Sequence, residues 1–155
     1  MKKATLFFVL VIAFSFVKAQ SNKEEIDLIQ SVFGMEKKAI IAEFVKVDAA
    51  QKDAFWALYD EYETKRKELG KNRIALLEDY ADNYDKLTNE KAESWTKEVI
   101  NQGKKTDDLL VTYTKKISKA VSPIAALQFF QVESYILSGI RLSILEELPL
   151  PDVKH

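Results

Sequence analysis

The chain offers very little material for catalytic chemistry. Its only histidine, His155, is the last residue, and the 155 residues contain no cysteine. Histidine general bases, thiol nucleophiles and zinc sites of histidine and cysteine are therefore excluded by composition. The Glu-x-x-His motifs that bind paired iron ions in helical bundles are also absent. The composition predicts a protein that is not an enzyme and has no cofactor or metal.

Paired carboxylates are the remaining candidates for acid–base chemistry or divalent-metal binding. Their spacing places them on helix surfaces or in turns, and no activated partner accompanies them. We interpret them as solvated acidic faces, with an enzyme that uses carboxylates alone as the alternative. The pairs are Glu78 with Asp82, Asp107 with Asp108, and Glu146 with Glu147.

Three charged residues occupy positions where the surrounding pattern favours apolar side chains. Arg66 and Arg73 interrupt an apolar stripe at helical spacing, and Glu133 interrupts the apolar segment near the C-terminus. A carboxylate on an apolar face needs a partner, and a guanidinium can donate two hydrogen bonds to it. We therefore predict that Arg66, Arg73 and Glu133 meet in a structural ion pair that sets helix register, with a ligand site as the alternative.

Aromatic side chains accompany this stripe, and most of them are expected in the core. Trp56 lies beside the stripe, so we predict that it is exposed. Together with the basic residues Lys65 and Lys67, Trp56 is a candidate protein-binding surface, because tryptophan offers a large contact area with a polar edge. The stripe members predicted to be core are Phe55, Tyr59, Tyr62 and Tyr80.

The N-terminal residues 1–19 have the pattern of a signal peptide. Lys2 and Lys3 form a basic start, residues 4–17 form an apolar run of 14 residues, and Ala19 ends a cleavage pattern. The run is shorter than the roughly 18 residues that span a bilayer. No cysteine follows it, so no lipid anchor is expected. The pattern predicts cleavage after Ala19 and a soluble, exported protein in the periplasm.

The charge balance limits the kinds of partner. Without the three lysines of residues 1–19, the 23 basic residues become 20 against 24 acidic ones, a net charge of about −4. This balance disfavours a nucleic-acid partner or attraction to an anionic membrane. Proteins are the expected partners, either unfolded clients or an envelope signalling protein, and a homodimer is also compatible with the sequence.

The apolar spacing predicts an all-α fold in one domain, residues 20–151, followed by a short tail, residues 152–155. Apolar residues recur at steps of three and four, and only four glycines and three prolines interrupt them. The expected helices span about residues 23–45, 48–87, 89–119 and 122–148. We expect them to form an elongated four-helix hairpin or bundle, with the most apolar helix, 122–148, at the centre or at an interface.

Local signals mark the helix starts. Asp48 followed by Gln51 resembles a capping box, Thr88 or Asn89 can cap the third helix, and Ser122 before a proline starts the fourth. Gly34 is a candidate kink or break in the first helix.

Two short segments resemble the Leu-Thr-x-x-Gln motif of the Spy and CpxP periplasmic proteins. These segments are Val47-Asp48-Ala49-Ala50-Gln51 and Val121-Ser122-Pro123 with Gln128-Phe129. The resemblance implies an elongated helical hairpin, often a cradle-shaped dimer, that binds unfolded envelope proteins without ATP.

A more extended resemblance, over residues 47–151, is to exported helical bacterial proteins identified as sensors of extracytoplasmic sigma factors. That resemblance implies a role in envelope stress signalling. The matching stretches are Phe55-Trp56-Ala57-Leu58-Tyr59-Asp60-Glu61-Tyr62-Glu63, Asp79-Tyr80-Ala81-Asp82-Asn83-Tyr84, Ser122-Pro123 through Phe129 to Gln131-Val132-Glu133, and Glu147-Leu148-Pro149-Leu150.

Two functions follow as hypotheses. The first is a periplasmic protein-binding module of the Spy and CpxP type, acting as an ATP-independent chaperone or an envelope-stress sensor through a shallow helical surface. The alternative is a structural helical oligomer of the cell envelope with no client binding, in which the apolar fourth helix packs against its own copy.

Overall fold

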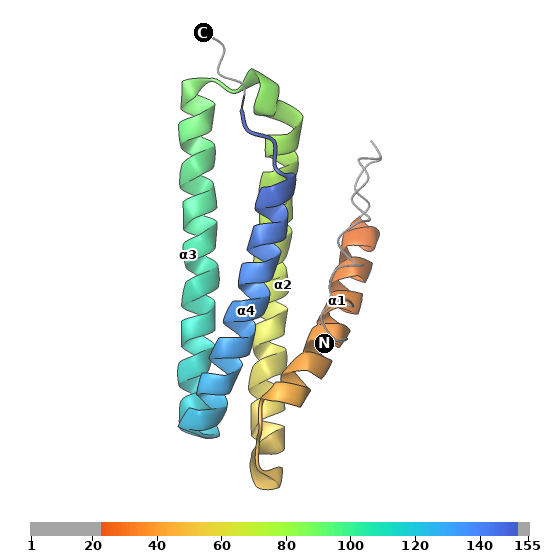
Figure 1. Cartoon of the computed structure of the whole chain (residues 1–155), viewed down its shortest axis with the longest axis vertical. Coiled ribbons are helices and arrows are strands. Elements are labelled where there is room, and N and C mark those ends of the chain that lie inside the picture. Colours follow the sequence, from red (N-terminus) through yellow and green to blue (C-terminus); the bar gives the residue numbers. More distant parts are fainter. Residues whose placement is uncertain (1–22, 152–155) are drawn as a thin grey trace.

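The chain folds into four long helices. A computed structural model describes residues 23–151, and the side chains from residue 34 onward. Its α-helices are α1 (Lys23–Phe44), α2 (Lys52–Asn83), α3 (Asn89–Ala120) and α4 (Pro123–Glu147), and the 3₁₀ turns η1 (Ala49–Gln51) and η2 (Tyr84–Lys86) flank α2 (Figure 1). No strand occurs within the described residues, so the predicted all-α class is confirmed.

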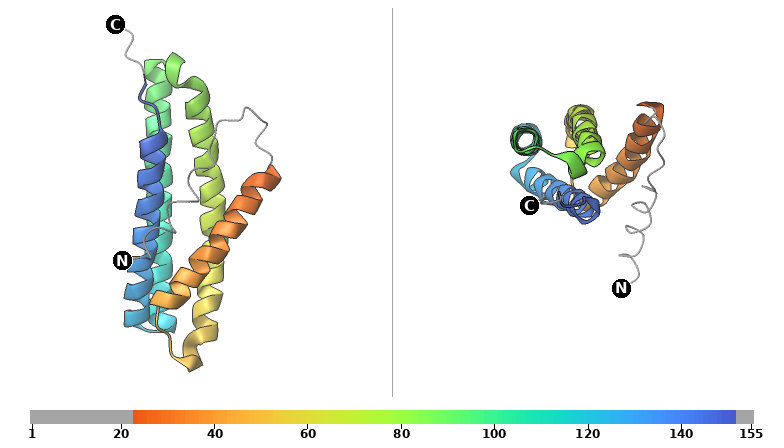
Figure 2. Two further views of the ribbon diagram at one scale, coloured as in Figure 1. Left: turned by 45° about the vertical axis from the view of Figure 1, so that its right-hand side comes forward. Right: turned by 90° about the horizontal axis from the view of Figure 1, so that it is seen from above.

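Helix α3 packs against both α2 and α4. Helices α2 and α3 form a long antiparallel hairpin, and α4 returns along α3 (Figure 1). Helix α1 crosses diagonally over the side that remains between α2 and α4 and contacts both (Figure 2). The result is an elongated three-helix body with α1 laid across one face.

The structure confirms the local signals that begin α3 and α4. The Thr88 hydroxyl accepts a hydrogen bond from the Lys91 N–H at 3.2 Å, and the Ser122 hydroxyl accepts one from the Ala125 N–H at 3.1 Å. Pro123 occupies the first turn of α4, where its missing N–H has no helical acceptor. Helix α1 continues through Gly34, so the expected break is not observed there.

The expected capping box at Asp48 is wrong. Asp48 precedes η1 and makes no side-chain capping bond. The Gln51 amide, expected to reach back to Asp48, instead donates to the Val121 carbonyl at 2.7 Å. A tertiary acceptor in the α3–α4 turn thus takes the side chain that the local motif would have used.

The main core lies at the end of the bundle where α1 meets α2. All four aromatic residues predicted to be core are buried, with exposed fractions of 0–6%. The last of them, Tyr80, lies toward the other end of α2. The core cluster consists of Ile41, Val45, Phe55, Tyr59, Tyr62, Leu110, Tyr113, Ile117, Val121, Ala125, Ala126 and Phe129.

The opposite end is held by a smaller aromatic contact. The ring centres of Tyr80 and Trp95 lie 4.5 Å apart. Tyr80 donates its hydroxyl to the Pro149 carbonyl at 2.6 Å, and Trp95 donates its indole N–H to the Leu76 carbonyl at 2.9 Å. These bonds fasten the segment after α4 and the start of α3 to α2.

The signal peptide expected at residues 1–19 and the tail expected at 152–155 lie outside the described residues. Between residues 23 and 151, no helix combines the length and apolar character needed to cross a membrane.

Candidate functional site

Glu133 of α4 is completely buried, with an exposed fraction of 0%. It lies on the same helix face as the core residue Phe129 and the buried Ile136, so the fold of α4 against α3 carries it inside. Its Oε1 atom accepts hydrogen bonds from the Lys37 ammonium and from the Tyr62 hydroxyl, the latter at 2.6 Å. Helices α1 and α2 therefore each supply one donor to this carboxylate.

Lys37 connects three helices through a second carboxylate. Its Nζ atom lies 2.5 Å from Oε1 of Glu63 on α2, while it also binds Glu133 on α4. Arg66 also binds Glu63, with its Nε atom 2.9 Å from Oε1 and its Nη2 atom 3.2 Å from Oε2. We call Lys37, Glu63, Arg66 and Glu133 the buried ion cluster. Its two cations and two carboxylates carry no net formal charge.

The cluster is strongly desolvated, and this changes its acid–base behaviour. Burial lowers the pKa of Lys37 despite the two carboxylates beside it. Burial alone would raise the pKa of Glu63, but the charges of Lys37 and Arg66 outweigh that effect and lower it. Burial and the charge of Glu133 raise the pKa of Tyr62. Glu63 is therefore ionised, and Tyr62 remains a neutral donor, near neutral pH.

The predicted ion pair of Arg66, Arg73 and Glu133 needs correction in its partners. Arg66 donates to Glu63 of its own helix, and the cation bound directly to Glu133 is Lys37. Arg73 lies two turns beyond Arg66 and is half-buried. Burial and the nearby charge of Arg141 lower the pKa of Arg73. Periodicity had placed these residues on the inner faces but could not determine which helices meet there.

The sequence also contains a signal for Lys37. Phe33, Lys37 and Ile41 follow one another at steps of four, so Lys37 interrupts an apolar row just as Arg66 does in α2. Ile41 is fully buried and Lys37 has an exposed fraction of 1%. A charged residue inside an apolar row thus marked a cluster member in each of the three helices.

Trp56 is not the exposed contact that was predicted. Its ring packs edge-on against two core residues, with ring centres 5.0 Å apart for Phe55 and 5.4 Å apart for Tyr59. The Lys38 ammonium of α1 lies over the same ring, 5.1 Å from its centre. Helix α1 therefore covers part of Trp56 and leaves it half-buried.

The two lysines expected beside Trp56 lie on different sides of α2. Lys65 faces α3, because its ammonium lies 5.6 Å from the centre of the Tyr113 ring of α3; it also lies 3.3 Å from Glu61 of α2. Lys67 faces α1, and a Cβ atom added to Gly34 would lie 3.4 Å from its Nζ atom. The predicted surface of Trp56, Lys65 and Lys67 is therefore not one continuous face.

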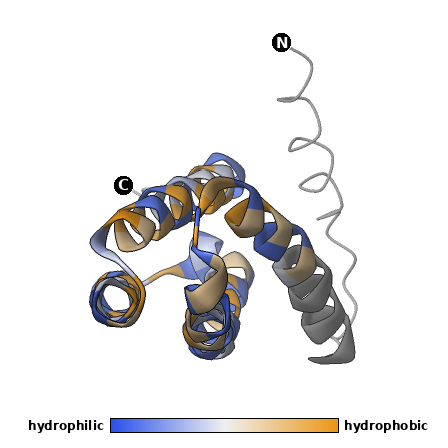
Figure 3. Ribbon diagram, turned by 90° about the horizontal axis from the view of Figure 1, so that it is seen from below, coloured by the Kyte–Doolittle hydropathy of each residue, from blue (hydrophilic) through white to orange (hydrophobic). Residues whose placement is uncertain are grey.

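A different surface offers exposed apolar side chains. Its five large apolar residues have exposed fractions between 55% for Leu127 and 76% for Tyr135. Residues 123–140 carry a single charged side chain, the buried Glu133. Apolar residues recur along the whole of α4 in the view coloured by hydropathy (Figure 3). We call this surface the α4 face, formed by the exposed residues Ile124, Leu127, Gln131, Tyr135, Ser138, Leu142 and Leu145.

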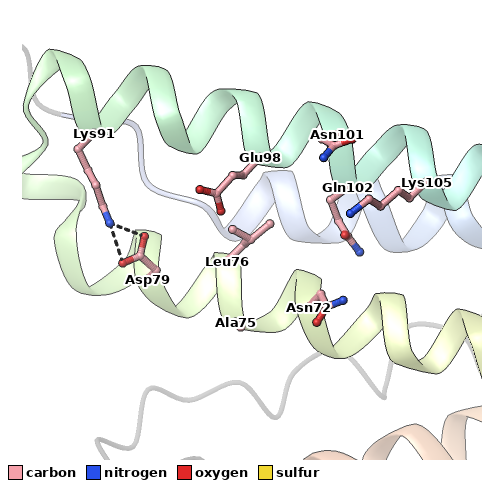
Figure 4. Close-up of a pocket in the computed structure, with 9 residues that line it drawn as sticks. All are labelled: Asn72, Ala75, Leu76, Asp79, Lys91, Glu98, Asn101, Gln102 and Lys105. Carbon is pink, nitrogen blue, oxygen red and sulfur yellow. Dashed lines mark hydrogen bonds and ion pairs between the residues drawn. The ribbon is translucent and has the colours of Figure 1, made fainter.

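Two open hollows lie between α2 and α3, one mainly polar and the other mainly apolar. The polar hollow is lined by Asn72, Glu98 and Gln102, among others, and an ion pair of 3.1 Å between Lys91 and Asp79 crosses its end (Figure 4). Gln102 directs its amide to the Leu69 carbonyl at 2.5 Å. Within the described residues, no three acidic or histidine side chains converge in the manner of a metal site.

Comparison with protein-family models, with characterised proteins and with solved structures gives no match.

Proposed function

We propose that this protein is an exported protein-binding module of the Spy and CpxP type, an ATP-independent chaperone or an envelope-stress sensor. The observation that carries the proposal is the α4 face, where five large apolar side chains are exposed along one helix. Apolar patches of this kind on a folded protein commonly mark the binding sites of other proteins. The pattern of residues 1–19 supports export, and the lack of cysteine and of any histidine other than His155 favours binding over catalysis.

The shape of this surface favours protein segments over small molecules. Small ligands are usually bound in concave pockets that bury most of their surface. The α4 face is instead a row of side chains along the outside of a helix, with Leu127 and Leu142 about four turns apart. Such a row fits an amphipathic or unfolded segment that presents apolar side chains at similar intervals. The proposed ligand is therefore an exposed apolar stretch of another protein.

Aggregation of a chemically denatured client provides the test. The protein, purified from an exporting host, should suppress aggregation at up to equal molar ratio. Leu127→Gln and Leu142→Gln should reduce this suppression, because each removes apolar contact area from the α4 face. The matched control is Ile100→Gln on α3, since Ile100 is similarly exposed at 67% but lies outside the face. Absence of suppression with several clients would overturn the proposal.

Salt dependence separates this site from the one expected from the sequence. A surface based on Lys65 and Lys67 would bind more weakly as salt screens its charges. Binding to the uncharged α4 face should change little between low and physiological salt. A steep loss with salt would therefore place the binding site elsewhere.

The alternative function is a structural oligomer of the envelope that binds no client. The same α4 face favours it, because a face that is permanently covered by another chain would also be apolar. In that case the protein would not suppress aggregation at any dilution, and the Leu127→Gln variant would lose assembly instead.

A further inference from the structure

The apolar and polar residues of the α4 face follow nearly the same order in both directions along the helix. Its outer positions, Ile124 and Leu127 at one end and Leu142 and Leu145 at the other, are apolar. Its inner positions, Gln131 and Ser138, are polar and lie at equal distances from a midpoint between residues 134 and 135. A twofold axis requires a patch that is complementary to itself, and this arrangement has that property.

We infer that the α4 face binds a second copy of this chain, with the two α4 helices antiparallel and the twofold axis between Ser134 and Tyr135. Ile124 then packs on the partner's Leu145, and Leu127 packs on the partner's Leu142. Gln131 lies opposite the partner's Ser138. Apolar residues thus meet apolar residues, and the polar residues near the axis can form hydrogen bonds that fix the register.

The spacing of the face suits a pair of helices. Six steps separate Ile124 from Leu145 over 21 residues, an average of 3.5 residues per step. This is the period that keeps two helices in contact as they wind around each other with a crossing angle near 20°. At 1.5 Å per residue the shared seam is about 32 Å long.

Charges at the ends of α4 favour the antiparallel arrangement. The exposed Glu146 and Glu147 stand in the last turn of α4. In an antiparallel pair they lie near the beginning of the partner's α4, where the helix dipole favours negative charge, and near the partner's Lys119 at the end of α3. In a parallel pair the four glutamates would lie together and repel one another. Charge complementarity therefore selects the antiparallel dimer.

This inference rests on the proposed function and deepens it, because it names what covers the α4 face when no client is bound. The polar residues near the axis limit the apolar area that pairing buries. We therefore expect a weak dimer that client segments can displace. Excess client should convert dimers into complexes that contain one protomer each.

Charge-bearing variants test the register through analytical ultracentrifugation of the full protein across the micromolar range. Wild type should show a concentration-dependent monomer–dimer equilibrium. Leu127→Lys and Leu142→Glu should each weaken the dimer more than about tenfold, because each buries a charge against a leucine. Both side chains are more than half exposed in one chain, so circular dichroism should show unchanged folding.

Combining the two substitutions distinguishes the antiparallel register from other pairings. The double variant should recover the dimer, because every lysine then faces a glutamate of the other copy. An equimolar mixture of the two single variants should form heterodimers for the same reason. The control Ile100→Lys should dimerise like wild type. A wild type that stays monomeric, or a double variant that does not recover, would overturn the inference.

The outcome for dimerisation is separable from the outcome for client binding. A monomeric wild type that still suppresses aggregation removes the dimer and leaves the proposed function in place. If wild type dimerises, but neither the diluted wild type nor the monomeric variants bind client, the pairing is confirmed and the proposed function is overturned.

Discussion

Lys37 and Glu133, 96 residues apart in the chain, form a buried ion pair that ties α1 to α4. The same ammonium binds Glu63 of α2 at 2.5 Å. Helix α1 crosses the body diagonally and shares fewer contacts with it than α2 and α3 share with each other. The buried ion cluster therefore attaches α1 to both α2 and α4.

Removing Lys37 should destabilise the fold strongly. Lys37→Met leaves Glu133 buried with only the Tyr62 hydroxyl as donor, and losing one member of a buried ion pair typically costs about 3–5 kcal/mol. Urea unfolding followed by circular dichroism measures the loss. The matched control is Lys91→Met, because the exposed pair of Lys91 with Asp79 should contribute less than about 1 kcal/mol.

A second substitution should rescue part of that loss. In Lys37→Met with Glu133→Leu, the uncompensated carboxylate is gone, while Glu63 keeps its two bonds from Arg66. The double variant should be more stable than Lys37→Met alone. Equal stabilities would show that Glu133 does not depend on Lys37 in the folded state.

Acid should weaken the protein partly through Glu63. Its pKa in the folded protein lies below the ordinary value of 4.5, because the charges of Lys37 and Arg66 outweigh its burial. Its stabilising effect is therefore complete above pH 4.5 and is lost as the pH falls through the folded pKa. We expect the free energy of unfolding to decrease below pH 4.5.

The variant Glu63→Gln measures how much of this acid sensitivity comes from Glu63. Although Glu63→Gln is less stable at neutral pH, its free energy of unfolding should depend less steeply on pH in the acid range. Glu93→Gln, at an exposed position of α3, is the control and should follow wild type. An unchanged slope in Glu63→Gln would assign the acid sensitivity to other carboxylates.

Loss of the Ser122 cap should lower stability moderately. The hydroxyl of Ser122 satisfies the Ala125 N–H at the start of α4, and replacing such a cap by alanine typically costs about 1 kcal/mol. Thr96→Ala, at an exposed position within α3, should cost nothing or stabilise slightly, since alanine favours helix. Thermal unfolding of the two variants compares a cap with an ordinary helical position.

Trp56→Ala should affect stability more than client binding. The Trp56 ring packs on Phe55 and Tyr59, so its removal leaves a gap beside the core. Client binding should persist at a temperature where the variant is folded, whereas Leu127→Gln should lose binding and keep its stability. Loss of client binding in Trp56→Ala, with binding retained in Leu127→Gln, would place the binding surface on α2.

Several features were predictable because they depend on neighbours in the sequence. Thr88 and Ser122 cap their helices through hydrogen bonds that span three residues, and the spacing of Phe55, Tyr59 and Tyr62 defines one helix face. Such contacts form wherever the local chain is helical. The sequence analysis therefore located the helices and much of the core.

The partners of the charged residues were not predictable in the same way. Helical spacing indicated that Arg66 and Glu133 face inward, but the diagonal path of α1 brings Lys37 to Glu133 and leaves Arg66 on Glu63. Gln51 likewise bonds to Val121 in a distant turn instead of the expected Asp48. Which side chains meet depends on crossing angles and offsets between helices, which local spacing does not encode.

The sequence by itself determined the all-α class and the starts of α3 and α4, because apolar spacing and capping act within one helix. It also contained the symmetric order of residues along α4. Only the tertiary structure decided that this order faces outward, that α1 covers Trp56 and that Lys37 completes the ion cluster. Burial and pairing arise between helices, and their relative placement is set by the packing of the whole chain.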